Sequence, residues 1–209
     1  MSVIVVARRR ARPGQETALL REWVRQVEAP AVWSLHRRAG RLFEDRAAPG
    51  TLLYVGDWET RAAFWARTQE DAARQRLDVL SEAPRYAFFQ PLAVHEVVGR
   101  HMALGDFTFV RTGMADRAAV LEALQARDAS GGSPGAEFVA RYLCEDVGDR
   151  EHFLLFQAWE APALDGLEPL LERVLSTTAA RVEHVTACAR VERDRLGTWP
   201  VGQIALATA

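Results

Sequence analysis

The residues of this sequence best suited to chemistry are aromatic, and most of them fall within one stretch of the chain. Tyr54 and Trp58 are four residues apart in an expected strand, so their side chains point to the same face of the pleat. The adjoining segments add Trp33, His36, Phe64, Trp65 and Tyr86. Such a set can bind a flat aromatic ligand by apolar contact and stacking. A plain hydrophobic core uses the same residue types, so the pattern alone leaves both interpretations open.

Composition excludes several other reaction classes. All 26 basic residues are arginine, and the absence of lysine removes Schiff-base enzymes and P-loop nucleotide hydrolases. The segment that starts at His95 and Glu96 resembles a zinc-protease motif, but Gly99 stands where the second histidine is required. We therefore expect no metal site.

Charge and hydropathy bear on partners and location. The formal net charge of −2 argues against nucleic acid as the main partner, because phosphate contacts need a concentrated basic field. The start of the chain lacks the basic region of a secretory signal, and no apolar stretch is long enough to span a membrane. The sequence favours a cytoplasmic protein without a membrane partner.

An internal repeat is the most informative feature of the chain. The segment Leu42–Asp45 recurs as Leu143–Asp146, and Leu52–Glu59 recurs as Phe153–Glu160, both displaced by 101 positions. A constant displacement without a gap indicates a tandem duplication. We expect two domains and a tail, at residues 1–99, 104–193 and 194–209.

Each half predicts the element order βαββαβ of a ferredoxin-like unit. In the first half, we expect strands at residues 3–10, 35–45, 51–58 and 87–98, with helices at 15–28 and 61–80. In the second, we expect strands at 107–111, 137–145, 152–159 and 182–191, a helix capped by Asp116, and a helix with an apolar stripe of Leu164, Leu167, Leu171 and Val174.

Two strands are apolar on both faces of the pleat, namely Val3–Val6 and Phe153–Phe156. Helices can cover only one face of a four-stranded sheet, so the other face must meet a second apolar surface. The sequence predicts two sheets packed face to face within one chain. Cys144 and Cys188 fall on strands at opposite edges of their sheet, too far apart for a disulfide, and should be free thiols.

These patterns resemble the antibiotic biosynthesis monooxygenase family, whose members form dimeric α+β barrels from two ferredoxin-like subunits. The resemblance covers nearly all of residues 2–98, and residues 104–193 form a more degenerate copy. It rests on Arg12-Pro13-Gly14, the Asp45 to Gly50 hairpin, Leu53–Thr60, and the pair Ala63-Phe64. The resemblance implies an α+β fold in which the two repeats form an intramolecular dimeric α+β barrel.

The family implies a small set of activities. Some members oxidise anthrone-like polycyclic aromatics with dioxygen and without metal or flavin, others degrade haem, and others act on quinols or lack a settled substrate. Haem degradation uses an Asn, a Trp and a His, but this chain has no Asn, and Arg67 and Leu77 occupy the positions of the Trp and the His. The resemblance therefore implies a cofactor-independent monooxygenase for an aromatic or quinonoid substrate. The alternative is a non-catalytic small-molecule-binding or stress-response protein of the same fold.

Oxygenation without a cofactor needs a base or hydrogen-bond donor beside the substrate hydroxyl. His36 and His152 are the candidate bases, and we take His36 with Tyr54 as the catalytic pair; an ordinary surface or hydrogen-bonded histidine is the competing interpretation. The expected substrate-binding residues are Trp33, Arg38 (as an oxyanion partner), Trp58, Phe64, Trp65 and Tyr86.

The repeat predicts that the two halves differ in role. Where the first half has His36 and Tyr54, the second has Glu137 and Leu155, although it keeps Trp159. We expect the working pocket in the first half and a mainly structural second half. The expected partners are the aromatic substrate and dioxygen, within an internal pseudo-dimer whose further dimerisation the sequence leaves open.

Overall fold

The computed structural model describes residues 2–28, 37–69, 72–97, 102–129, 138–160 and 180–194. Its elements are β1 (Val3–Arg10), α1 (Glu16–Glu28), β2 (Arg37–Asp45), β3 (Thr51–Trp58), α2 (Arg61–Gln69), α3 (Ala72–Leu80), β4 (Arg85–Glu96), β5 (Leu104–Arg111), α4 (Arg117–Ala129), β6 (Phe138–Asp146), β7 (His152–Trp159) and β8 (Arg181–Asp194). The expected helix around Leu171 and the chain from residue 195 onward lie outside the described residues. Within the described ranges, the helices fall short of the length and apolarity needed to cross a membrane.

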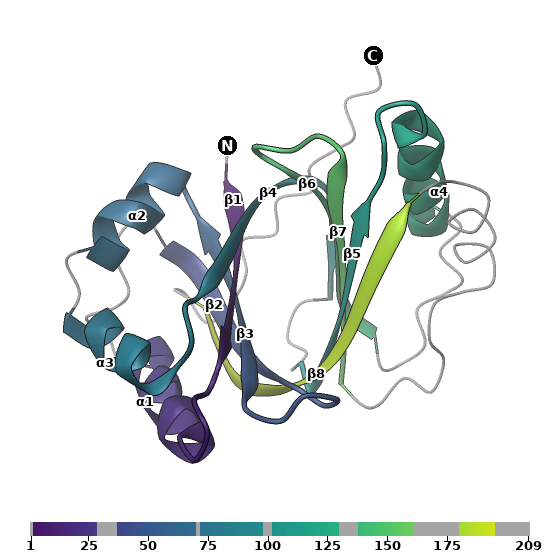
Figure 1. Ribbon diagram of the computed structural model, residues 1–209. Coiled ribbons are helices and arrows are strands. Elements are labelled where there is room, and N and C mark those ends of the chain that lie inside the picture. The colour runs from purple at the N-terminus through teal and green to yellow at the C-terminus, as the bar shows by residue number, and fades with distance from the viewer. Residues whose placement is uncertain are drawn as a thin grey trace.

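The eight strands form one closed barrel in the order β1-β3-β2-β8-β5-β7-β6-β4. Residues 3–96 contribute the run β4-β1-β3-β2, and residues 104–194 contribute the corresponding run β8-β5-β7-β6. Figure 1 places α1, α2 and α3 on one side of the barrel and α4 on the opposite side. The fold is therefore α+β and antiparallel, with a ferredoxin-like strand order in each run.

The two runs share their hydrogen-bond register. Val3 is paired with Trp58 between β1 and β3, and Leu104 is paired with Trp159 between β5 and β7. The irregularity near the start of β2 recurs at the corresponding position of β6. The displacement between equivalent pairs equals the displacement of the sequence repeat.

The barrel closes where the outermost strands of the two runs pair with each other. β2 pairs with β8, where Glu44 lies opposite Cys188, and β4 pairs with β6, where Gln90 lies opposite Glu145. Closure leaves none of these strands with an unpaired edge. The residue pattern predicted two facing sheets and the family resemblance implied a barrel; the structure adds that the outermost strands of the two runs are hydrogen-bonded to each other.

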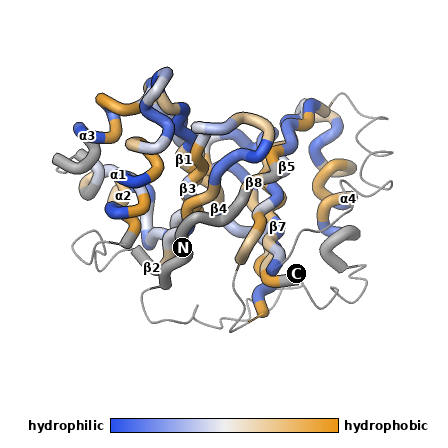
Figure 2. The backbone as a smooth tube through the Cα atoms, turned by 90° about the horizontal axis from the view of Figure 1, so that it is seen from below, coloured by the Kyte–Doolittle hydropathy of each residue, from blue (hydrophilic) through white to orange (hydrophobic). Residues whose placement is uncertain are grey.

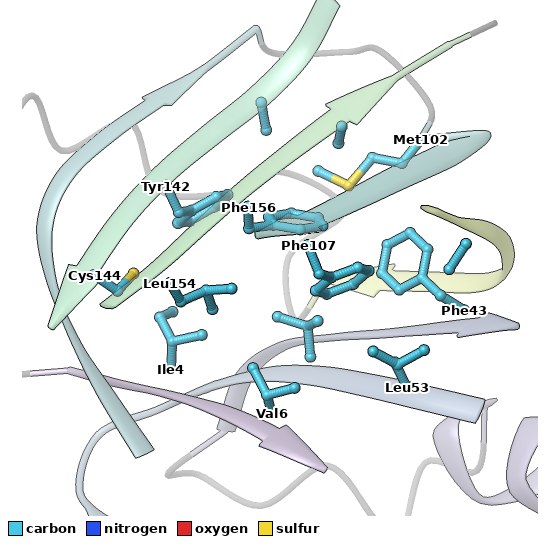
Figure 3. Packing of buried hydrophobic residues seen from close by; sticks show 14 of the residues in the cluster. Ile4, Val6, Phe43, Leu53, Met102, Phe107, Tyr142, Cys144, Leu154 and Phe156 are labelled. Atoms are coloured by element: carbon cyan, nitrogen blue, oxygen red, sulfur yellow. The ribbon is translucent and has the colours of Figure 1, made fainter. Parts of the chain in front are cut away.

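Closure explains why some strands are apolar on both faces. Ile4 and Val6 of β1 point into the barrel, whereas Val3 and Val5 pack on the outside with Phe64 of α2. β7 behaves in the same way: Leu154 and Phe156 line the interior, while Phe153 and Leu155 pack with Val120 and Leu124 of α4. Figure 3 shows Ile4, Val6 and Leu53 facing Leu154, Phe156 and Tyr142 across the interior. Figure 2 shows the matching apolar stretches along the strands and on α4.

A polar group inside the barrel connects strands of both runs. Arg41 of β2 lies 3.2 Å from a carboxylate oxygen of Glu96 in β4, and the Tyr142 hydroxyl of β6 donates a hydrogen bond to the same carboxylate. Burial raises the pKa of Tyr142 well above its usual value, so this phenol stays protonated as the donor. Arg41 and Tyr142 are themselves equivalent positions of the repeat.

The single helix expected over residues 61–80 was wrong, because the structure has two helices, α2 and α3, in this region. Phe64 of α2 packs with Trp58, whereas Leu77 of α3 packs in a separate cluster with α1. At about 100° per residue, these side chains would point about 140° apart on one straight helix. Two helices allow both side chains to be buried against the same sheet.

Cys144 is a free, fully buried thiol, as the sequence predicted. Burial raises the pKa of this thiol far above its usual value, so it remains protonated and unreactive. The side chain of Cys188 lies outside the described residues.

A carboxylate at the contact between α1 and α3 provides a test of helix packing. Glu22 accepts hydrogen bonds from Arg25 at 2.6 Å, from Arg76 of α3 at 2.9 Å, and from Gln26 at 3.0 Å. The hydrogen bond from Arg25 makes the largest contribution; together with Arg76 and Gln26 it outweighs burial and lowers the pKa of Glu22 to about 2.

We predict that Glu22→Gln lowers the free energy of unfolding by about 1–2 kcal/mol at neutral pH. Because the pKa is lower in the folded state, the carboxylate stabilises the fold above the pKa of the unfolded chain. This contribution is lost as the pH falls toward about 2. Urea unfolding of both proteins between about pH 7 and pH 3 measures the difference. A difference that does not shrink with falling pH would contradict the assignment.

Candidate functional site

Three of the expected site residues are not placed. Trp33 and His36 lie outside the described residues. Arg38 belongs to β2, but its side chain is outside the described part of the structure. The predicted base and oxyanion partner therefore stay predictions.

The other expected residues lie between the outer face of the barrel and the helices that cover it. Phe64 of α2 occupies the centre of a ring cluster, with its centroid 5.4 Å from Trp58, 5.1 Å from Trp65 and 5.5 Å from Tyr86. Trp58 and Phe64 are buried, whereas Trp65 and Tyr86 are partly exposed. The cluster therefore reaches from the core to the protein surface.

Tyr54 lies on the same outer face but packs in a neighbouring cluster. Its ring stacks on Trp23 of α1 at a centroid distance of 6.3 Å. The Arg9 guanidinium lies over the Trp23 ring, 5.7 Å from the ring centroid. The expected aromatic lining is thus two clusters, one under α1 and α3 and one under α2.

The two clusters meet above Gly56. A Cβ atom at this position would lie 2.3 Å from the Tyr54 hydroxyl oxygen and 2.7 Å from the Trp58 indole nitrogen. Both atoms are buried, and no described residue accepts a hydrogen bond from the Trp58 N–H. An unsatisfied buried donor costs free energy, and structures rarely retain one without a reason.

Glycine is needed at this point of the sheet for steric reasons. Gly56 pairs with Val5 of β1 on one side and with Gly40 of β2 on the other. Two adjacent positions without side chains leave the outer face open to the Tyr54 hydroxyl and the Trp58 indole. The Tyr54 hydroxyl and the Trp58 indole nitrogen occupy the space that a side chain at position 56 would need.

Arg9 is a site neighbour whose environment the sequence did not predict. Arg9 belongs to a run of three arginines at the end of β1, yet its side chain is only 2% exposed. Its guanidinium donates to Asp78 at 2.7 Å, to Ser81 at 2.9 Å and to the Tyr86 hydroxyl at 3.4 Å. The alternation of side chains along β1 could have predicted this burial, because Arg9 points to the same face of the strand as Val5 and Ala7.

The second half carries a polar group at the corresponding outer face, which the sequence analysis also missed. Asp106 of β5 accepts a hydrogen bond from the Trp159 indole at 3.0 Å and lies 3.7 Å from His184 of β8. The internal repeat could have pointed to this polar group, because it aligns Asp106 with the apolar Val5. A polar residue at a position that is apolar in the other copy suggests a separate role.

Solved structures with this fold cover nearly the whole chain. A candidate monooxygenase from Fusobacterium nucleatum matches with a TM-score of 0.74 and 10% identity, over 93% of this chain and 94% of that chain. An anthrone oxidase-like protein matches with a TM-score of 0.69 and 11% identity, over 92% and 93%. A ferredoxin-fold protein from Listeria monocytogenes, related to antibiotic biosynthesis monooxygenases, has a TM-score of 0.50 and 10% identity, over 91% and 96%.

The structural similarity agrees with the resemblance drawn from the sequence. At these identities the likeness shows the fold alone, which this chain shares with the three proteins named above. No protein-family model matches the sequence, and no curated protein matches it.

We predict that Gly56→Ala disrupts the contact between the two clusters. The added methyl group must displace the Tyr54 hydroxyl or the Trp58 indole, at a cost of about 1–3 kcal/mol in the free energy of unfolding. Gly113→Ala is the matched control, because nothing lies within 4 Å of its added Cβ. Urea unfolding followed by tryptophan fluorescence measures both; equal stabilities of the two variants would contradict the close approach.

Proposed function

We propose that this protein is a cofactor-independent, monooxygenase-like protein that acts on an aromatic or quinonoid small molecule with dioxygen. The observation that carries the proposal is the buried indole N–H of Trp58, for which no described residue is an acceptor, beside the Tyr54 hydroxyl within aromatic surroundings. The similarity in fold to candidate monooxygenases and to an anthrone oxidase-like protein supports it.

The chemistry of the site fits an aromatic ligand that carries an oxygen atom. The rings of Phe64, Trp65 and Tyr86 offer apolar and edge-to-face contacts to a flat ring system. The Trp58 N–H can donate only, so its complement is a carbonyl, phenol or phenolate oxygen. The Tyr54 hydroxyl, as the proposed catalytic donor, supports the same oxygen as negative charge develops on it.

The proposed reaction uses one molecule of dioxygen per substrate molecule and needs no external reductant. A base removes a proton from the methylene group of an anthrone-like substrate, and the resulting anion passes one electron to dioxygen. The two radicals combine through a new C–O bond to give a peroxide, which takes up the proton. Loss of water from this hydroperoxide leaves a carbonyl group, so that one CH₂ and one O₂ become one C=O and one H₂O. We assign the base to His36 and oxyanion support to Arg38, with Trp33 among the binding residues.

We also propose that residues 1–99 and 104–193 are two domains of an intramolecular pseudo-dimer. The identical register of β1–β3 and β5–β7 supports this proposal, as do the two equivalent junctions β2–β8 and β4–β6. In this arrangement one chain supplies both subunits of the dimeric barrel to which its sequence is similar.

The extensive contacts among the rings favour a second candidate, a non-catalytic binding protein. Phe64 touches Trp58, Trp65, Tyr86 and Phe88, as an ordinary aromatic core residue would. Oxygen uptake measured with an anthrone and with a hydroquinone separates the two candidates. Turnover above the uncatalysed rate supports the oxygenase, whereas binding without uptake supports the second candidate.

We predict that Tyr54→Phe lowers the rate of oxygen uptake about tenfold or more, because the hydroxyl beside the reacting oxygen is removed. Tyr142→Phe is the matched control: it removes a buried hydroxyl inside the barrel, away from the outer face. Its uptake rate should equal that of the unaltered protein, although its stability should fall. Equal rates for all three proteins would exclude Tyr54 from catalysis.

A further inference from the structure

The internal repeat provides a comparison for the buried Arg9. Between the sheet and α1, the first half has Arg9, Trp23 and Tyr54. The second half has aliphatic residues at the three equivalent positions, which are Val110, Leu124 and Leu155. All three are fully buried and pack in one apolar cluster with α4. The fold therefore forms with an aliphatic residue at the position of Arg9, and it does not by itself require an arginine there.

The burial of Arg9 is unfavourable for stability. Its side chain is 2% exposed, whereas the side chain of Asp78, its partner on α3, is 43% exposed. Removing a guanidinium from water has a desolvation penalty, and apolar replacements of buried ion pairs are often neutral or stabilising. An arginine that the other copy replaces by valine therefore indicates a role other than stability, as is common at functional sites.

The attachment of α3 to the sheet does not depend on the Arg9 side chain. The backbone N–H of Arg12 donates to the Leu80 carbonyl at 3.0 Å, and the N–H of Glu82 donates to the Arg10 carbonyl at 2.8 Å. These two hydrogen bonds connect the end of α3 to the end of β1. The ion pair between Arg9 and α3 is therefore an addition to a contact that the backbone already makes.

Arg9 contacts one ring of each aromatic cluster. Its guanidinium lies over Trp23, which stacks on Tyr54 in the cluster under α1 and α3. The same guanidinium donates to the hydroxyl of Tyr86, whose ring lies 5.5 Å from Phe64 in the cluster under α2. A planar guanidinium can stack on one ring and donate a hydrogen bond in its own plane at the same time.

The strand register explains why a residue of β1 can do this. Ala7 is paired with Tyr54 of β3 on one side and with Tyr86 of β4 on the other. Arg9 follows Ala7 by two residues and points to the same face, so it is the diagonal neighbour of both tyrosines. One side chain can therefore fix rings on both sides of its strand.

We propose that Arg9 is a positioning residue of the site at Tyr54 and Trp58. It holds Trp23 and Tyr86 in place, and through Trp23 it holds the ring of Tyr54. The expected effect on turnover rests on the function proposed above, whereas the placement of the rings is a property of the protein without ligand. The two parts are therefore tested separately.

The first test compares ring placement with stability in Arg9→Met, because methionine is unbranched and fills space without a charge. We expect the urea midpoint to equal or exceed that of the unaltered protein, since the remaining Asp78 carboxylate reaches water. The near-ultraviolet circular dichroism, which reports fixed aromatic packing, should lose intensity. A lowered midpoint or a failure to fold would make Arg9 a structural residue, and an unchanged spectrum would show that the rings need no guanidinium; each result overturns the proposal.

The second test measures oxygen uptake with an anthrone. Arg9→Met should lower kcat about tenfold or more with little change in KM, because a displaced Tyr54 hydroxyl weakens an interaction made in the transition state. Arg9→Lys should not restore the rate, since an ammonium group has no planar fork. Full rescue by lysine would show that charge alone matters and would overturn the proposal, as would an unchanged kcat in Arg9→Met.

Arg117→Met is the matched control. Arg117 of the second half also lies over an aromatic ring, 5.8 Å from the centroid of Phe153, and also forms an ion pair, with Glu145. Its uptake rate should equal that of the unaltered protein, and an equal loss in both variants would contradict a specific role for Arg9. Absence of uptake by the unaltered protein would contradict the proposed function instead, and the spectrum and the urea midpoint would then decide the role of Arg9.

Discussion

The fold depends on closure of the barrel through the two junctions β2–β8 and β4–β6. A four-stranded sheet with two apolar faces cannot bury both faces with helices on one side, and its outer strands expose unpaired backbone groups. When the two runs of strands join, their inner faces are buried in one shared core. The outermost strands of each run then form hydrogen bonds with strands of the other run. The Arg41, Glu96 and Tyr142 contacts then connect β2, β4 and β6 within that core.

The two halves differ inside the barrel, where Arg41 is equivalent to Tyr142, and they also differ on their outer faces. The first half has glycines at two paired positions and brings Tyr54 and Trp58 together above one of them. The second half fills the equivalent surface with Asp106 and His184. Duplication permits this divergence, since the inward residues of both copies must pack together in the shared core while the outward residues of each copy can change independently.

Much of this architecture follows from the sequence, and the remainder depends on contacts between distant segments. The uninterrupted apolar run from Val3 to Val6 predicts burial on both faces, and the internal repeat predicts the equivalent registers. The division of residues 61–80 into two helices reflects tertiary packing of Phe64 and Leu77, which local propensity does not encode. The proximity of Arg9 to Asp78 depends on where α3 lies on the sheet, and that of Asp106 to His184 depends on the pairing of β5 with β8. The expectation that the second half is mainly structural did not include this polar face.

The most direct test of the functional account is a crystal structure of the protein with a bound anthrone. The account predicts ligand density on the outer face of β3, with a ligand oxygen within hydrogen-bond distance of the Trp58 indole nitrogen and of the Tyr54 hydroxyl, and the ring system against Phe64 and Trp65. Density inside the barrel, or a ligand that leaves the Trp58 N–H without an acceptor, would contradict it.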